Sequence, residues 1–206
     1  MNWRTTIVLL VIVVALSLFV GLYERKLQST DEARQAAKRV VPGLEEHREK
    51  VSRIVIERPR SSVKETDTSK NGPDTGPVQR VELKRTATDV WRITSPIAYP
   101  ADMYRARGIV SALIYLEKRG IDPRNPKALA IRPQDGGELN PADFHLDQAG
   151  RIRVACYGAD AEGTEEKLLA EIYISGQKLL GGDALYAALP ASIKKEVYVV
   201  GASLFS

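Results

Sequence analysis

The stretch RVELKRTATDVWRIT, residues 80–94, contains two short runs in which hydrophobic side chains alternate with charged or polar ones. Val81 and Leu83 are the central hydrophobic residues of the first run, and Trp91 and Ile93 are those of the second. Successive side chains of a β-strand point to opposite faces, so each run predicts a strand with one buried face. We therefore expect this part of the chain to contribute two half-buried strands to a sheet.

Similar short patterns recur on both sides of this stretch. Further strands are expected at residues 51–57, 152–157, 168–175, 185–189 and 197–200. The last strands are separated by few residues, which favours antiparallel pairing, because parallel neighbours need a crossover of about a dozen residues or more.

One helix is clearly predicted among these strands. Asp102 suits the position before its first turn, and Gly120 suits the position after its end. Ala106, Ile109, Val110, Leu113 and Ile114 follow the helical period. The order of elements predicts an α+β fold, in which a mainly antiparallel sheet carries the main helix on one face. The expected core comprises Val81, Leu83, Trp91, Ile93, Ile109, Leu113, Ile152, Val154 and Ile172, with Cys156 buried beside them.

The N-terminal run IVLLVIVVALSLFVGLY, residues 7–23, contains no charged side chain. Its length approaches the roughly 20 residues that cross a bilayer, and it predicts a transmembrane helix. A cleaved signal peptide and a buried helix are the alternatives; the run is longer than a signal peptide requires, and Glu24-Arg25 follows instead of a small-residue cleavage site. The expected membrane-spanning residues include Ile7, Leu10, Val14, Leu18 and Tyr23.

A second helix is expected after Ser29, which has capping-box spacing to Glu32. It carries a narrow stripe of small hydrophobic residues: Ala33, Ala36, Ala37, Val40 and Val41. The stripe is a docking face for a partner's helix, or it packs on the chain's own domain, or it belongs to a half-ordered stalk. The chain is thus divided into a transmembrane anchor (1–26), a helical stalk or linker (27–50) and an α+β soluble domain (51–206) with a flexible loop at 65–77.

Composition and motifs point to no particular chemistry. Thirty Lys and Arg are nearly balanced by 26 Asp and Glu, so no nucleic-acid partner is expected. Cys156 has no histidine placed beside it by the sequence, and Asp143, His145 and Asp147 fall in an expected helical turn, where side chains two residues apart diverge. Gly181-Gly182 needs only a turn. We therefore predict no enzyme activity, no cofactor and no metal site.

The chain resembles a bacterial family of membrane-anchored proteins whose soluble domain is a domain of unknown function, often encoded beside gliding-motility-type ABC transporters. The matching features run from the apolar N-terminus through VSRIVIERP (51–59) to KEVYVV (195–200). Between them lie VWRI with Pro96, Pro100-Ala101-Asp102, Phe144–Asp147, Ile172–Gly176 and Tyr186–Pro190. Family members usually have glycine where this chain has His145, so the chain departs from the family pattern at that turn. The family has no established catalytic residues to carry over.

Together these features predict a single-pass protein of the cytoplasmic (inner) membrane that acts as an accessory or scaffold protein. Its partner would be another envelope protein, for which an ABC-type transporter is a candidate. The alternative is a binding module for a small ligand or an envelope polymer. Charges flanking residues 7–23 favour a cytoplasmic domain, with Arg4 before them and Arg25, Lys26, Arg34, Lys38 and Arg39 after. The resemblance implies an extracytoplasmic one, which we expect because long domains are translocated largely regardless of charge.

Overall fold

The computed structural model of the protein describes residues 35–59, 78–87, 90–120, 128–159, 166–179 and 181–202, together with residues 3, 13, 16, 17 and 19. The chain divides into two compact units, residues 1–37 and 38–206. The second unit contains the sheet and the surfaces described below.

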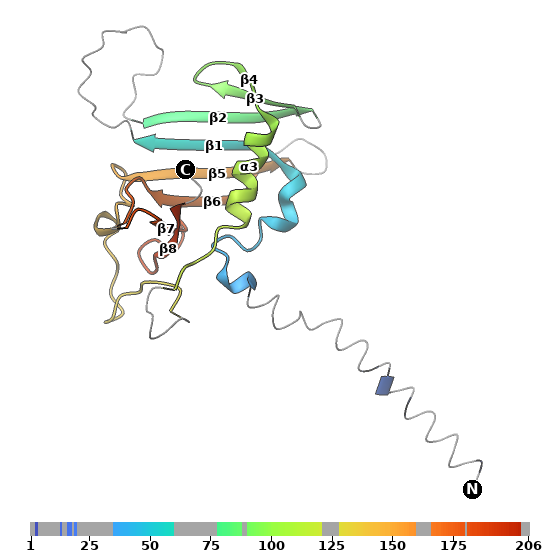
Figure 1. Ribbon diagram of the computed structural model, residues 1–206, viewed down its shortest axis with the longest axis vertical. Helices are drawn as coiled ribbons and strands as arrows, with labels where there is room; N and C mark the ends of the chain where they lie inside the picture. Colours follow the sequence, from blue (N-terminus) through green and yellow to red (C-terminus); the bar gives the residue numbers. More distant parts are fainter. Residues whose placement is uncertain are drawn as a thin grey trace. The chain divides into compact units, whose positions relative to one another are not determined.

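Within the described residues, eight strands form one sheet in which every neighbouring pair is antiparallel. They are β1 (Val51–Pro59), β2 (Val78–Ala87), β3 (Val90–Ser95), β4 (Tyr99–Ala101), β5 (Arg151–Ala159), β6 (Glu166–Ser175), β7 (Ala184–Ala188) and β8 (Tyr198–Gly201). Their order across the sheet is β4-β3-β2-β1-β5-β6-β7-β8, as Figure 1 shows. The seven expected strands are confirmed, and β4 is an addition.

Helix α3 (Met103–Ile114) crosses one face of this sheet (Figure 1). It begins as expected at Asp102, whose carboxylate accepts hydrogen bonds from the backbone N–H groups of Tyr104 and Arg105 at 2.8 and 3.3 Å. It ends at Tyr115 and not near Gly120, because the chain after it is extended. Two short 3₁₀ helices, η1 (Glu45–Lys50) and η2 (Pro141–Phe144), lie outside the sheet, and residues 35–38 are helical.

The main hydrophobic core lies between α3 and the sheet. Trp91, Leu113 and Ile172 are buried there, and Cys156 has no exposed surface. The remaining expected core residues are also part of this cluster, either buried (Leu83, Val154) or half-buried against it (Val81, Ile93, Ile109, Ile152). The expected core is therefore confirmed.

The opposite face of the sheet carries a network of ion pairs. Arg153 joins Glu57 at 3.1 Å and Glu171 at 2.6 Å, and so links three neighbouring strands. The network comprises Arg53, Arg80, Lys84 and Arg153 with Glu57, Glu82, Glu166 and Glu171. Val55 and Ala155 are buried although the sheet pleat places them on this face. We infer that the stems of the long charged side chains cover them.

The fold class expected from the sequence is corrected. The described residues form mostly an antiparallel sheet of eight strands with few helices, whereas the sequence predicts an α+β fold behind a transmembrane helix. None of the helices in the described part of the chain combines the length and the apolar composition needed to cross a membrane. Of the expected membrane-spanning residues, Ile7, Leu10, Val14, Leu18 and Tyr23 lie outside the described residues, as does the expected loop 65–77.

The segment that precedes η1 belongs to the sheet domain. The N–H of Val40 donates to the carbonyl of Leu116 at 2.9 Å, and the N–H of Lys118 donates to the carbonyl of Lys38 at 2.7 Å. Val40 and Leu44 are fully buried in the main core. The second compact unit consequently begins at Lys38, within the segment 27–50 that the sequence suggests is a stalk or linker.

Candidate binding surfaces

The residues that the sequence suggests as possible metal ligands or nucleophiles, Asp143, His145, Asp147 and Cys156, lie within the described part of the chain. Asp143 lies in η2, whose first turn is capped by Asn140, and His145 follows it with a left-handed backbone (φ 53°). Within the described residues, no group of three or more His, Cys, Asp or Glu side chains is placed to hold a metal ion. Burial raises the pKa of the Cys156 thiol to about 12, so this thiol is protonated at neutral pH.

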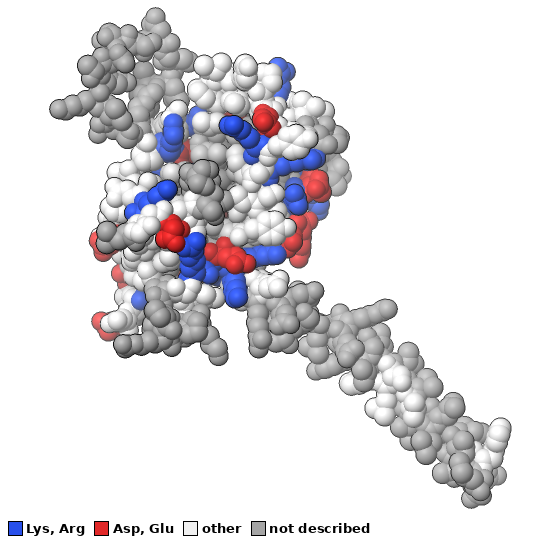
Figure 2. All heavy atoms as spheres, in the orientation of Figure 1, with Lys and Arg blue, Asp and Glu red and all other residues white. Residues whose placement is uncertain are grey.

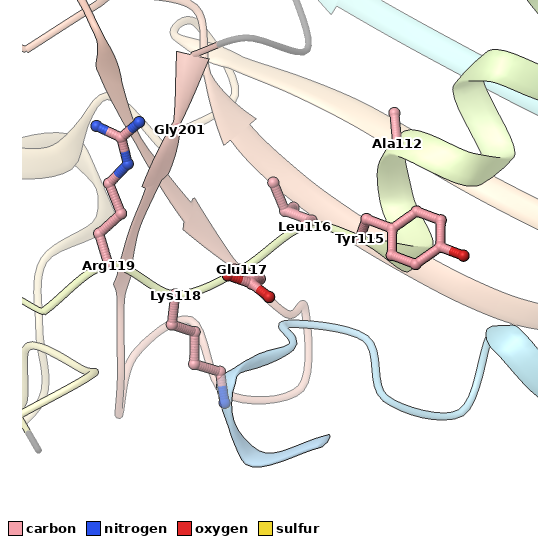
Figure 3. Close-up of a pocket in the computed structure, with 7 residues that line it drawn as sticks. All are labelled: Ala112, Tyr115, Leu116, Glu117, Lys118, Arg119 and Gly201. Carbon is pink, nitrogen blue, oxygen red and sulfur yellow. The ribbon is translucent and has the colours of Figure 1, made fainter. Parts of the chain in front are cut away.

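An open cavity of about 420 Å³ lies beside the C-terminal end of α3 (Figure 3). Its wall is the extended segment 116–119, which adds along the outer edge of β8 through a bond from the Arg119 N–H to the carbonyl of Val199 at 2.7 Å. The Arg119 guanidinium lies against Gly201 and pairs with Asp183 at 3.0 Å. A Cβ at Gly201 would stand 3.0 Å from that guanidinium, so the glycine permits the close approach.

A charged cluster adjoins this cavity. The Tyr198 hydroxyl donates to one oxygen of Glu196, and Arg132 Nη2 contacts the other at 3.1 Å. The hydrogen bond from Tyr198, together with Arg132, lowers the pKa of Glu196. Burial lowers the pKa of Lys118, whose ammonium lies 4.6 Å from the centre of the Tyr198 ring. Burial and mutual pairing account for these shifts, so they do not by themselves indicate catalysis.

A groove of about 290 Å³ lies between α3 and the sheet. Ile56, Ile109 and Ile152 are half-buried around it, and its other aliphatic lining residues are Ala112, Leu113, Val154 and Ile174. Arg58 is the polar side chain in the lining and donates to Gln79 at 2.7 Å. The groove is therefore able to accept an apolar group of modest size.

Among the described residues of the sheet domain, the most exposed large hydrophobic side chains fall within residues 97–104. Ile97 is 70% exposed, Tyr99 is 67% exposed and Tyr104 is 78% exposed. We call these three residues the 97–104 patch. They lie around β4, the edge strand that pairs with β3, and on the first turn of α3 (Figure 1).

The residues of the docking stripe expected from the sequence differ in exposure, from fully buried to exposed. Val40 is buried in the main core and Val41 is half-buried against it, so a partner could reach Val40 only by displacing that core. Ala36 is half-buried and Ala37 is exposed, while Ala33 lies outside the described residues.

The 97–104 patch was missed by the sequence reasoning. The sequence signal for this patch is the segment PIAYP, residues 96–100, in which two large hydrophobic side chains stand between prolines. Proline lacks the N–H of a sheet ladder, so these hydrophobic residues are poor candidates for an interior strand.

Comparison with known proteins identifies no family for this chain. No protein-family model, curated protein or solved structure matches this chain. The resemblance to the membrane-anchored bacterial family stays a prediction from the sequence.

Proposed function

We propose that this protein is an accessory or scaffold protein of the cell envelope whose sheet domain binds another envelope protein through the 97–104 patch. The observation that carries the proposal is the exposure of three large hydrophobic side chains within one short segment. Aromatic side chains are enriched at protein interfaces and dominate their binding energy, because they bury a large area with few rotatable bonds. A transporter is a candidate partner, on the strength of the family resemblance.

The partner contact would be made by side chains and not by an added strand. Strand β4 is only three residues long, and Pro100 at its centre has no N–H to donate to a further strand. Tyr99 and Tyr104 instead present a hydroxyl on an apolar ring. Such side chains suit a surface that is hydrated in the free protein and buried in the complex with a partner.

The balance of positive and negative charge on other surfaces also supports a protein partner. The ion-pair network on the opposite face of the sheet pairs four cationic with four anionic side chains, so the network has no excess of one sign. On the face that Figure 2 shows, Lys and Arg side chains are interspersed with Asp and Glu. Both observations favour a protein partner over a nucleic acid.

Site-specific photo-crosslinking in the native host tests the proposal. A photoreactive phenylalanine analogue is placed at Tyr99 or Tyr104, and Tyr115 serves as the matched control, because it is an exposed tyrosine (58%) at the other end of α3. We expect one discrete crosslinked partner, recovered from the membrane fraction, at positions 99 and 104 only. Crosslinks at Tyr115 alone would assign the interface to another surface, and no discrete product at any position would contradict a stable partner.

The groove beside α3 favours a second candidate function, a binding module for a small apolar ligand. Its described lining residues are aliphatic except for Arg58, and its volume lies near the lower limit of small-molecule sites. Saturable uptake of a fluorescent apolar probe by the purified chain, with no crosslinked partner, would favour this function over protein binding.

A further inference from the structure

Three arginine side chains from three different elements converge on one small hollow beside α3. Arg48 comes from η1, Arg85 from β2 and Arg107 from α3. The hollow measures about 110 Å³, and a water molecule in the liquid occupies about 30 Å³, so there is room for roughly three or four waters. This size suits a small polyatomic anion better than a nucleotide or a peptide.

The floor of the hollow is apolar and its rim is cationic. Val51, Trp91 and Val110 line it and are at most 4% exposed, while Glu49 is the acidic residue of the lining. Among the described residues of the lining, three side chains are positively charged and one is negatively charged. An apolar floor keeps water to one side, which strengthens the attraction between these arginines and an anion relative to open solvent.

Hydrogen bonds to neutral oxygens hold two of the guanidinium groups. Arg85 Nη2 donates to the backbone carbonyl of Glu49 at 2.7 Å, and Arg48 Nη2 donates to the hydroxyl of Ser111 at 3.3 Å. A guanidinium has five N–H donors, so one bond to a neutral acceptor positions the group without neutralising its charge. A guanidinium held in place in this way can donate two parallel N–H hydrogen bonds to two oxygens of one phosphate.

We propose that this arginine hollow, formed by Arg48, Arg85 and Arg107 over Trp91, is a binding site for a phosphate group. The ligand is free inorganic phosphate or the phosphate of a monoester. The hollow shares no residue with the 97–104 patch, and the proposal does not depend on the proposed function.

Isothermal titration calorimetry of the full-length chain at constant ionic strength tests the proposal. We expect saturable one-to-one binding of inorganic phosphate and weaker binding of acetate, which has one charge and two oxygens. Glycerol 3-phosphate is the third probe; tighter binding than phosphate identifies an esterified ligand, and equal or weaker binding identifies the free ion. Phosphate heats that do not saturate, or acetate affinity equal to that of phosphate, would overturn the site.

Substitutions then assign the binding to this hollow. Arg48→Gln and Arg107→Gln should each weaken phosphate binding about tenfold or more, since each removes charge-assisted hydrogen bonds. Arg92→Gln is the control, because Arg92 is an exposed arginine on β3 that does not line the hollow. Thermal unfolding of each variant verifies that it is folded. Unchanged affinity in both folded hollow variants, or equal losses in all three variants, would show that the hollow is not the site.

Discussion

Cys156 is a hydrophobic core residue in a position where a thiol has little chemistry. It lies on β5 opposite Ile54 of β1 and Ala170 of β6, and it has no exposed surface. The thiolate is the reactive form of cysteine, and burial raises the pKa of this thiol to about 12. Both access and ionisation therefore oppose its modification in the folded protein.

We expect a bulky maleimide to leave Cys156 unlabelled at pH 8 in the native chain and to label it completely in denaturant. Mass spectrometry measures both states. Tyr104→Cys provides the control, because Tyr104 is 78% exposed and a cysteine there should be labelled without denaturant. Rapid native labelling at Cys156 would mean that β5 is accessible from one face.

At the scale of elements, helix α3 is held mainly by its buried stripe. Leu113 is 4% exposed and belongs to the main core, whereas Tyr104 on the same helix projects into solvent. Replacing a packed leucine by alanine removes buried methyl groups and leaves a cavity. The helix should therefore tolerate change on one side only.

Leu113→Ala should lower the free energy of unfolding by about 2–5 kcal/mol. Tyr104→Ala, on the exposed side of the same helix, should change it by about 0.5 kcal/mol or less. Urea unfolding followed by circular dichroism measures both variants. A loss below about 1 kcal/mol for Leu113→Ala would mean that this part of the helix is not packed on the sheet.

Local patterns predicted most elements of the sheet domain, and their failures have physical reasons. Alternation over 80–84 and 90–94 is a local property, and β2 and β3 form where it occurs. Strand β4 was missed because three residues around Pro100 are too short to show a period. The end of α3 was misplaced because Leu116 and Lys118 bond to the distant segment 38–40, which no local pattern reveals.

The candidate surfaces were less predictable than the fold. The arginine hollow combines residues from η1, β2 and α3 that are far apart in the sequence, so only the tertiary structure brings them together. The 97–104 patch is continuous in the sequence, but its exposure depends on the position of β4 at the edge of the sheet.

At the scale of the whole molecule, the sheet domain is defined by its non-local contacts and begins before the first strand. Val40 and Leu44 are the hydrophobic residues that anchor the segment 38–44 to the core. Burying two such side chains contributes about 3–6 kcal/mol, a large share of the 5–15 kcal/mol that stabilises an ordinary domain.

A chain that begins at Lys38 should therefore fold, with a cooperative urea transition. A chain that begins at Val51 should lose this transition or unfold at a much lower urea concentration. Circular dichroism and tryptophan fluorescence measure both, since Trp91 lies in the core. Equal midpoints for the two chains would place the domain boundary at β1.

The hydrogen bonds of residues 38–40 also determine how the domain would bear mechanical load. Tension applied through the chain before Lys38 would first reach the two backbone bonds to Leu116 and Lys118, while Val40 and Leu44 resist extraction in parallel. The Arg119 bond to Val199 would then pass part of that tension to β8. A pull from the N-terminal side is thus shared between α3 and the far edge of the sheet, without being concentrated on a single strand.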